Sequence, residues 1–402
     1  MKAKILPEVY DIFDPQEPLT GEKLREYYVN RESPVKRLSE ILKTTKKPLK
    51  YLFVGSRGNG KSTELNKLSE LVKDKLFIVS FSIKDRLNLF DVEYADILLV
   101  IGAEIYDKVS EQIELSKELD EYLNSWSETV VEMVEEKQKG VGLGVGFTAI
   151  VNLSGKIKTQ VTTREITRDI IKPRMSDLID AINKIIVDAE GKLGKNLLVI
   201  IDDLDKVNLE KAEELFYMHG AELTQPICKV IYTIPQPLLF SNKVRQIVLQ
   251  YFNNREVLGN IKVHDKNGNL NSESCEIMKD VALRRMSEDL ITEEALGTAI
   301  EFSGGILTEF IRIIKDAANI ANTEGRERIE NEDVEHAITE IRNDYVRILS
   351  KEDIEILKSV SETKEKTDKE IFQDLLFSLA ILEYSNGDIW YDIHPTIKGV
   401  LE

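Results

Sequence analysis

Residues 51–63 have the sequence Tyr-Leu-Phe-Val-Gly-Ser-Arg-Gly-Asn-Gly-Lys-Ser-Thr, in which an apolar run leads directly into the pattern G-x-x-x-x-G-K-S. The apolar run predicts a buried strand, and the amphipathic run after the pattern predicts a helix. Between them, Gly55, Gly58 and Gly60 allow successive backbone N–H groups to converge on phosphate oxygens, where a Cβ would obstruct them. The stretch therefore predicts a strand, a phosphate-binding loop and a helix, in that order.

The residues of this loop suggest individual roles in binding a nucleoside triphosphate with Mg²⁺. We expect Lys61 to reach the terminal phosphates and Ser62 to offer its hydroxyl to the metal. The helix that begins there points the positive end of its dipole at the anion. The residues that we expect to line the phosphates are Gly55, Ser56, Arg57, Gly58, Asn59, Gly60, Lys61, Ser62 and Thr63.

A second apolar run, residues 196–201, is closed by Asp202, Asp203 and Asp205. Continuous hydrophobicity is typical of a parallel strand that is buried on both faces, and open α/β sheets bind ligands at the carboxyl ends of such strands. We expect Asp202 to bind Mg²⁺ directly or through water, because Mg²⁺ takes few protein ligands. We expect Asp203 to orient or deprotonate the attacking water, with Asp205 as the competing candidate. Many ATPases carry the longer glutamate at the second position, so the aspartate predicts slow hydrolysis.

Composition narrows the classes of protein that the chain can belong to. Its 402 residues predict two or three domains, and a hydrophobic content of 42% suffices for packed cores. The formal net charge of −17 repels nucleic acid and acidic membrane surfaces. Cys228 and Cys275 are too few for a disulfide framework or a thiolate metal site. We expect a cytoplasmic protein without a membrane-spanning segment.

The order of elements predicts a mainly parallel α/β sheet in residues 51–270. We expect further strands over 76–81, 196–201, 229–235 and 257–263, and helices between them. In residues 140–147, glycines alternate with Val141, Leu143, Val145 and Phe147, a period of two that predicts a β-hairpin inserted over 137–165. No Lys-Ser or Lys-Thr follows these glycines, which disfavours a second phosphate-binding loop.

The remainder of the chain has mainly helical spacing of its apolar residues. Residues 271–349 predict a helical domain, and residues 350–402 predict two short helices followed by a hairpin around Asn386-Gly387. Helices before a terminal hairpin are typical of a winged-helix domain. The predicted organisation is an N-terminal segment over 1–50, a core over 51–270, a helical lid over 271–349 and a winged-helix-like domain over 350–402.

With Gly55–Thr63, Ile201–Asp205, Thr233 and Ser303-Gly304-Gly305 in place, the chain resembles AAA+ P-loop ATPases of the initiator-like branch and the related bacterial STAND signalling ATPases. The resemblance implies a P-loop core, a helical lid and a winged-helix domain. It implies that Arg31, with Tyr28 and Val29, packs near adenine, that Thr233 is the polar sensor of the γ-phosphate or the lytic water, and that an arginine finger stands before the last core strand. Arg255 occupies that place and Arg245 is its rival. Thr308 stands where such lids usually carry an arginine, which Arg312 on the next turn could replace.

Three classes of function remain open. The first is an ATPase that uses ATP and Mg²⁺ to switch the position of its lid and winged-helix domain, with a protein partner or further copies of itself, in a bacterial defence or signalling module. The second is an initiator or loader that binds DNA, which the net charge and the acidic C-terminus disfavour. The third is a scaffold that binds ATP without hydrolysing it. A GTPase-type Asn-Lys-x-Asp motif is not evident at a suitable position, which favours ATP over GTP.

Overall fold

The computed structural model describes residues 2–240, 250–252, 254–367, 370–385 and 387–401. The chain divides into two compact units, which we describe separately. The sheet unit consists of residues 36–54 and 68–256. The helical unit consists of residues 1–35, 55–67 and 257–402, and it therefore contains the glycine loop of residues 55–60.

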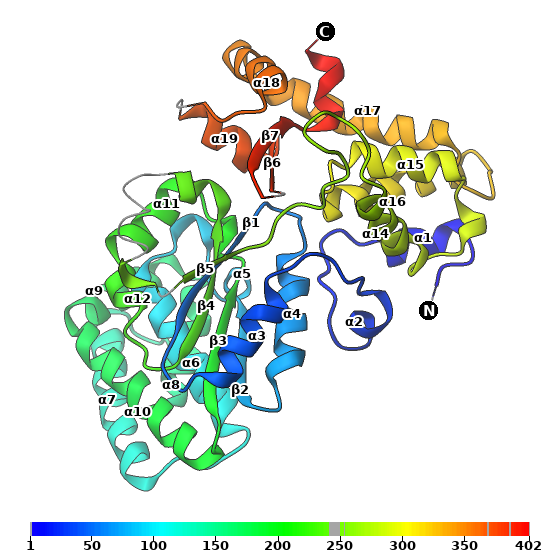
Figure 1. Cartoon of the computed structure of the whole chain (residues 1–402). Helices are drawn as coiled ribbons and strands as arrows, with labels where there is room; N and C mark the ends of the chain where they lie inside the picture. The colour runs from blue at the N-terminus through cyan, green and yellow to red at the C-terminus, as the bar shows by residue number, and fades with distance from the viewer. Residues whose placement is uncertain (1, 241–249, 253, 368–369, 386, 402) are drawn as a thin grey trace. The chain divides into compact units, whose positions relative to one another are not determined.

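The sheet unit is built on a five-stranded sheet with the strand order β2-β3-β4-β1-β5 (Figure 1). The strands are β1 (Lys50–Gly55), β2 (Leu76–Ser82), β3 (Asn196–Asp202), β4 (Lys229–Pro235) and β5 (Asn254–Val257). β2 pairs with β3, and β3 with β4, in parallel. The register sets Ser82 opposite Asp202, so β2 and β3 end at the same edge. The prediction of an α/β fold with a parallel sheet core is confirmed.

Helices pack against this sheet because their apolar residues recur at helical spacing. α6 packs on α10, and α10 ends at Gly194, whose φ of 64° is the left-handed conformation common at helix C-termini. Pro173 lies in a 3₁₀ turn that separates α9 from α10. The helical segments here are α3 (Val35–Thr44), α5 (Ile83–Arg86), η1 (Leu89–Asp91), α6 (Tyr94–Ser110), α7 (Lys117–Lys137), α8 (Thr148–Ile157), α9 (Val161–Ile171), η2 (Lys172–Arg174), α10 (Met175–Leu193), η3 (Leu204–Lys206), α11 (Leu209–Glu213), η4 (Glu214–Met218), α12 (Gly220–Leu223) and η5 (Gln236–Phe240). Helix α4 (Lys61–Val72) is divided, because its residues 61–67 belong to the helical unit.

The prediction of an inserted β-hairpin over 137–165 is wrong, because residues Thr148–Ile157 form helix α8. The four alternating glycines, Gly140, Gly142, Gly144 and Gly146, all have positive φ, whereas a strand needs negative φ at each residue. The buried residues of α8 include Ala149, Ile150, Leu153 and Ile157, which follow a helical period that the glycine alternation before them obscured.

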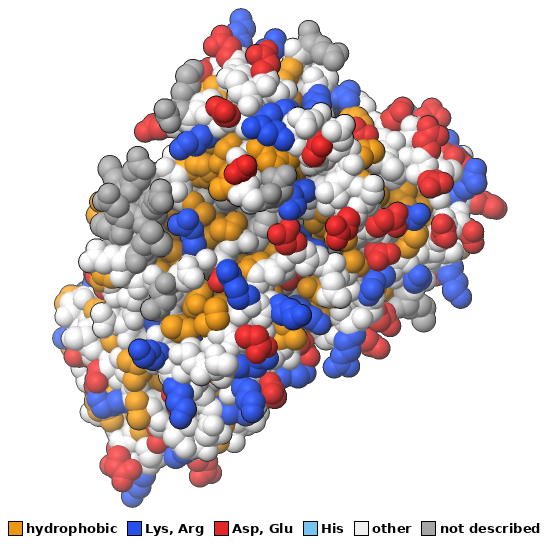
Figure 2. All heavy atoms as spheres, in the orientation of Figure 1, with side chains coloured by type: hydrophobic (Ala, Val, Ile, Leu, Met, Phe, Trp, Pro, Cys, Tyr) orange, Lys and Arg blue, Asp and Glu red, His pale blue; other side chains and the backbone are white. Residues whose placement is uncertain are grey.

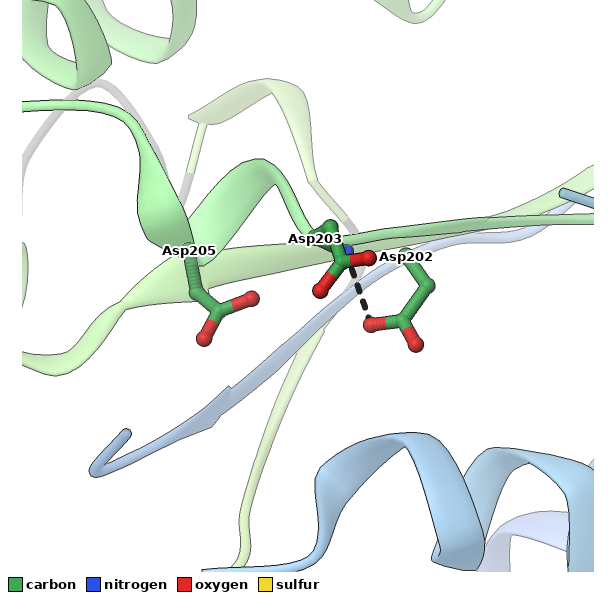
Figure 3. Close-up of side chains that lie close together, drawn as sticks. All are labelled: Asp202, Asp203 and Asp205. Carbon is green, nitrogen blue, oxygen red and sulfur yellow. Dashed lines mark hydrogen bonds between the residues drawn. The ribbon is translucent and has the colours of Figure 1, made fainter. Parts of the chain in front are cut away.

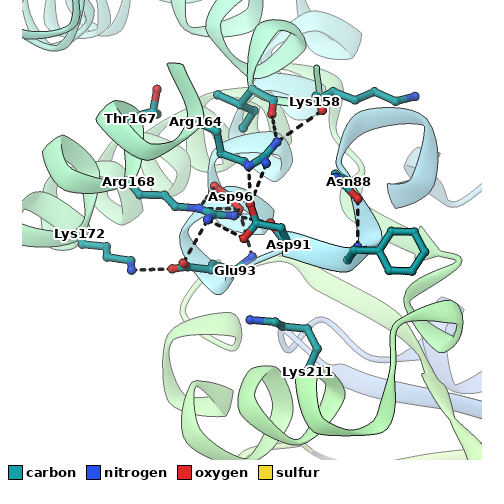
Figure 4. A network of polar contacts seen from close by, with 12 residues as sticks. Asn88, Asp91, Glu93, Asp96, Lys158, Arg164, Thr167, Arg168, Lys172 and Lys211 are labelled. Atoms are coloured by element: carbon teal, nitrogen blue, oxygen red, sulfur yellow. Dashed lines mark hydrogen bonds and ion pairs between the residues drawn. The ribbon is translucent and has the colours of Figure 1, made fainter. Parts of the chain in front are cut away.

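A partly buried network of charges holds α9 against η1 and the start of α6 (Figure 4). Arg168 donates from Nε to both carboxylate oxygens of Asp96, at 3.1 Å each, and from Nη1 to Asp91 Oδ1 at 2.9 Å. Arg164 donates from Nε to Asp91 Oδ2 at 2.9 Å and from Nη1 to the carbonyl of Ile157 at 2.8 Å. Burial raises the pKa of Asp96, although Arg168 opposes the shift. The network therefore joins segments that are far apart in sequence, since Asp96 and Arg168 are separated by 72 residues.

The helical unit is assembled from both ends of the chain. α1 packs on α16, and a bridge joins Ala3 to Met286. Its elements are α1 (Leu6–Ile12), α2 (Gly21–Tyr27), α14 (Ser272–Leu283), η6 (Glu288–Leu290), α15 (Glu293–Phe302), α16 (Leu307–Thr323), α17 (Asn331–Ile348), α18 (Lys351–Thr363), α19 (Ile371–Phe377), β6 (Ile381–Ser385), β7 (Ile389–Ile393) and η7 (Pro395–Val400).

The predicted terminal hairpin is confirmed, since β6 and β7 pair antiparallel with Ile381 opposite Ile393. Its inner face packs on the residue before α16 in a buried cluster of Ile306, Leu382, Tyr384 and Trp390. We expected a strand over 257–263, but β5 covers Asn254–Val257 and residues 258–263 are not in a strand.

Candidate functional site

The glycine loop connects β1 to α4, and two of its glycines have backbone conformations that favour glycine. Gly58 and Gly60 have φ values of +73° and +90°, which side chains with a Cβ rarely adopt. α4 begins at Lys61, and the amide of Glu64 donates to the carbonyl of Gly60 at 3.0 Å. The N–H groups of the first turn therefore belong to the same short segment as the glycines, which is the arrangement that binds phosphate.

Lys61 folds back over this loop. Its buried ammonium donates to the carbonyls of Gly55 and Ser56 at 2.9 and 2.8 Å. Ser62 and Thr63 follow in the first turn of α4, and Thr63 Oγ1 accepts from the amide of Leu19 at 3.1 Å. The ammonium is thus held inside the loop by groups that a triphosphate could replace as partners.

Two of the N-terminal residues implied to contact adenine, Tyr28 and Arg31, contact the glycine loop or the start of α4. Tyr28 donates from its hydroxyl to the carboxylate of Glu64 at 3.3 Å, and burial, with Glu64, raises the pKa of Tyr28. Arg31 donates to the carbonyls of Asn59 and Gly259 at 2.9 and 2.8 Å. Val29 is half-buried. The structure therefore brings Tyr28 and Arg31 to the glycine loop.

The beginning of α16 touches the glycine loop directly, a contact that the sequence did not predict. The amide of Thr308 donates to the carbonyl of Gly58 at 3.0 Å. A Cβ placed on Gly58 would lie 1.8 Å from Thr308 Oγ1, so only glycine permits this approach. Arg57 stacks its guanidinium 3.9 Å from the ring centre of Phe377, the last residue of α19. Two neighbouring loop residues thus contact two different C-terminal helices.

The segment before α16 is in turn fixed by the hairpin. Tyr384 donates from its hydroxyl to the carbonyl of Gly304 at 2.7 Å, and Asn260 Nδ2 donates to the carbonyl of Glu383 at 3.0 Å. A Cβ on Gly305 would lie 1.7 Å from the carbonyl oxygen of Ile261. The Gly304-Gly305 pair is therefore a close-packed junction and not a loose linker.

Arg312, the candidate to replace the arginine absent at Thr308, has acidic partners on the helices. Its guanidinium lies 3.2 Å from Asp344 Oδ2 on α17 and 3.6 Å from Asp316 Oδ2. Glu309 is one turn earlier, and burial raises the pKa of its carboxyl group. Arg312 as a phosphate contact stays a prediction.

In the sheet unit, an acidic cluster follows β3. Asp202, Asp203 and Asp205 each offer a carboxylate oxygen, and these oxygens lie within 4.8 Å of one another (Figure 3). The amide of Asp203 donates to Asp202 Oδ1 at 2.8 Å. Asp203 has a φ of 67°, an uncommon conformation for a residue with a side chain. Oxygen ligands at the end of a buried strand suit a hard cation such as Mg²⁺.

Asp203 is surrounded by donors. Ser82, at the end of β2, donates to its Oδ2 at 2.6 Å. Lys206 lies 2.6 Å from its Oδ1, and Lys84 lies 3.2 Å from its Oδ2. Burial alone would raise the pKa of Asp203, but the hydrogen bonds from Lys206 and Ser82 and the charges of Lys206 and Lys84 outweigh it and lower the pKa. Asp203 is therefore a weak base in this conformation, and neither lysine was singled out from the sequence.

Thr233 is buried in β4 beside the turn that carries the acidic cluster. Its hydroxyl accepts from the amide of Leu204 at 3.1 Å and lies 3.4 Å from the carbonyl of Ile201. Arg255 is half-buried in β5. Arg245 lies outside the described residues. The sensor role of Thr233 and the finger role of Arg255 stay predictions.

The distribution of side chains on the surface and the character of the helices are relevant to binding partners and membranes. On the face that Figure 2 draws, Lys and Arg side chains stand among Asp and Glu side chains, with apolar patches between them. Within the described part of the chain, no helix has the length and apolar character needed to cross a membrane.

Comparison with known proteins gives similar structures but no family assignment. No protein-family model matches the chain, and no curated protein matches it. Cdc6p from Pyrobaculum aerophilum is 14% identical with a TM-score of 0.43, covering 97% of this chain and 95% of its own. The ORC1 protein of Aeropyrum pernix, solved in complex with DNA, is 13% identical with a TM-score of 0.46, covering 98% and 95%. A Walker-type ATPase of Pyrococcus abyssi is 17% identical with a TM-score of 0.44, covering 97% and 99%.

Proposed function

We propose that this protein is an ATP-binding molecular switch that hydrolyses ATP slowly and transmits the state of the nucleotide to its C-terminal helices and hairpin. The observation that carries the proposal is the pair of contacts from the glycine loop to the beginning of α16 and to the end of α19. A loop that binds phosphates cannot change its conformation without disturbing Thr308 and Phe377. The sequence resemblance to AAA+ and STAND ATPases supports the same reading.

The residues present fit ATP and Mg²⁺. The N–H groups of residues 55–63 and the ammonium of Lys61 offer donors to phosphate oxygens. Ser62 and Asp202 would hold Mg²⁺, which would neutralise charge on the phosphates. Tyr28 and Val29 would supply apolar contacts to adenine. Asp203 would orient or deprotonate the attacking water, Thr233 would sense the γ-phosphate, and Arg255 would act as a finger on a neighbouring copy.

Slow hydrolysis follows from the partners of Asp203. A general base must accept a proton, and two lysines with Ser82 hold the carboxylate in its ionised, hydrogen-bonded state. Asp203 can act on water only after it loses some of these partners. The same observation favours the scaffold without hydrolysis as the limiting case.

The proposal is tested by calorimetry of ATP binding together with phosphate release by the full-length chain. We expect one ATP per chain, and slow phosphate release that Asp203→Asn abolishes while ATP binding persists. ATP binding with no phosphate release, in the wild type and in the variant alike, would support the scaffold. Absence of ATP binding in the presence of Mg²⁺ would overturn the proposal.

A second candidate is an initiator or loader that binds duplex DNA. The confirmed hairpin after α18 and α19 is the observation that favours it, since a hairpin behind helices suits a winged-helix domain. Glu383, Asp388 and Asp392 lie in or beside this hairpin, and acidic side chains there repel phosphate. Duplex binding by the full-length chain that weakens steeply with salt would establish this candidate.

A further inference from the structure

Two side chains, those of Asn59 and Arg31, connect the glycine loop to residues 258–259, which follow β5. We call these two connections the braces of the loop. Asn59 Nδ2 donates to the carbonyl of Leu258 at 2.6 Å. Arg31 donates from Nη2 to the carbonyl of Gly259 at 2.8 Å and from Nη1 to the carbonyl of Asn59 at 2.9 Å. Arg31 therefore joins the loop to the segment that leads into the C-terminal helices, and both braces start from buried side chains.

The surroundings of Arg31 show why this position holds an arginine. Its side chain is 5% exposed, and its Nε lies 4.0 Å from Glu64 Oε1. Glu64 also accepts from the hydroxyl of Ser33 at 2.6 Å. A buried cation is costly unless it is paired, and Glu64 supplies the opposite charge. The planar fork of a guanidinium can donate to two carbonyls at once, whereas the ammonium of lysine is a compact point charge on a flexible stem.

The bond to Asn59 has a consequence for the next amide. In a trans peptide, the carbonyl of one residue and the N–H of the next point in opposite directions. With the Asn59 carbonyl turned toward Arg31, the N–H of Gly60 points away from Arg31. The amide of Gly60 is one of the donors that a phosphate-binding loop offers to its anion. Arg31 thereby sets the orientation of a donor that it does not itself touch.

We propose that Arg31 is a positioning residue for phosphate binding, which holds the Asn59–Gly60 peptide in its binding orientation and does not contact the base. The inference rests on the proposed function, because it assigns a role in the same nucleotide site. It differs from the adenine contact that the family resemblance implies for Arg31. The two roles are distinguishable, because a positioning role affects any polyphosphate and an adenine contact affects only a ligand with that base.

The test uses inorganic tripolyphosphate, which has the phosphates of ATP without its base. Dissociation constants of ATP and of tripolyphosphate are measured by direct and competition calorimetry for the wild type, Arg31→Lys, Asn59→Ala and the control Arg25→Lys, which changes an exposed arginine of α2. We expect Arg31→Lys to weaken both ligands by the same factor, about tenfold, since one charge-assisted hydrogen bond is lost. Asn59→Ala should weaken both in parallel, and Arg25→Lys should change neither.

Each other outcome contradicts the inference. A loss of ATP affinity alone in Arg31→Lys would assign the residue to the base, and unchanged affinity for both ligands would show that the brace has no effect on binding. Wild-type protein that binds ATP but not tripolyphosphate would also overturn it. Wild-type protein that binds neither would refute the proposed function as well, so the two failures are distinct. If Arg31→Lys unfolds, as thermal unfolding by circular dichroism would show, Asn59→Ala decides the question.

Discussion

Arg168 in the sheet unit and Arg31 in the helical unit both have buried side chains. They differ in how many of their guanidinium nitrogens donate hydrogen bonds. Each of the three nitrogens of Arg168 donates to Asp91, Asp96 or both, and Glu93 lies 3.2 Å from its Nη1. Arg31 donates with two nitrogens to backbone carbonyls, and its Nε has no hydrogen-bond partner among the described residues.

The difference separates a network that fixes helices from one that shapes a loop. Buried polar atoms without partners are rare in folded proteins, and they are tolerated where function requires them. Asn59 braces the glycine loop, and Asn260 follows Gly259, to which Arg31 donates. The side-chain oxygens (Oδ1) of both asparagines also lack a hydrogen-bond partner within the described chain. We therefore expect changes to the Arg168 network to affect stability and changes around Arg31 to affect ligand binding.

The largest effect should come from Arg168→Ala. The change leaves Asp96, which is 2% exposed, as a buried carboxylate without its cation. We expect a loss of about 3–5 kcal/mol in the free energy of unfolding. Urea unfolding measures it, with Lys172→Ala as the control, because that lysine is 41% exposed and pairs with Glu93 in the same network. A loss below 1 kcal/mol for Arg168→Ala would mean that the network is not a structural element.

Lys61→Ala should give the next largest effect, on ligand binding. The ammonium lies inside the glycine loop, where we expect it to reach the terminal phosphates. We expect ATP affinity to fall by about 100-fold, with little change in urea unfolding. Lys73→Ala, beyond the C-terminal end of the same helix, is the control. Equal ATP affinity in Lys61→Ala and Lys73→Ala would show that Lys61 does not contribute to ATP binding.

A third buried group, His394, should make the stability of the fold depend on pH. Burial lowers the pKa of His394 to about 3, and its Nε2 has no partner in the described chain. Between that pKa and the ordinary value near 6.5, the unfolded state binds the proton and the folded state does not. Stability from this group is thus complete above about pH 6.5 and is lost as pH falls, by up to about 1.4 kcal/mol per pH unit.

His394→Asn removes the titration and keeps an acceptor for the amide of Thr396. The measurement is the difference in unfolding free energy between wild type and variant at pH 7, 6 and 5, so that other titrating groups cancel. We expect the wild type to lose stability relative to the variant at the lower pH values. Parallel curves would show that His394 protonates in the folded protein at its ordinary pKa.

The smallest effect concerns Asp203, which is fully paired like Asp96 but stands in a candidate catalytic cluster. Removing its lysines in Lys84→Ala with Lys206→Ala should let the pKa of Asp203 rise toward its ordinary value. We expect phosphate release to increase a few-fold at saturating ATP, as a better base follows from a higher pKa. Lys211→Ala, whose lysine pairs with Glu214, is the control. A decrease in the double variant would instead show that these lysines assist turnover.

The fold was largely predictable because its strongest signals are local. The run of residues 196–201 is buried throughout in β3 apart from Asn196, and the Asn386-Gly387 signal lies between the two strands of a real hairpin. Gly58 and Gly60, where we expected a Cβ to obstruct the loop, both have positive φ. The inserted β-hairpin was predicted wrongly because glycine and apolar residues alternate over 140–146. Such alternation resembles that of a strand, but each of these glycines has a positive φ, which a strand does not allow.

The contacts around the loop were not predictable, since they join residues far apart in sequence. Gly259 is 228 residues from Arg31, and no spacing rule connects them. The same holds for Ser82 and Asp203, which are 121 residues apart. Parallel pairing of β2 with β3 brings Ser82 opposite Asp202, and register of this kind is known only once the sheet is assembled.

Hydrogen–deuterium exchange of the full-length chain, with Mg²⁺ and either ADP or a non-hydrolysable ATP analogue, tests whether the glycine loop transmits the nucleotide state to α16 and α19. Local opening of backbone amides reports changes in these segments. We expect residues 304–310 and 371–377 to exchange at different rates in the two nucleotide states, and Phe377→Ala to reduce the difference in 371–377. Identical exchange in both segments, while residues 55–63 become protected by nucleotide, would contradict it.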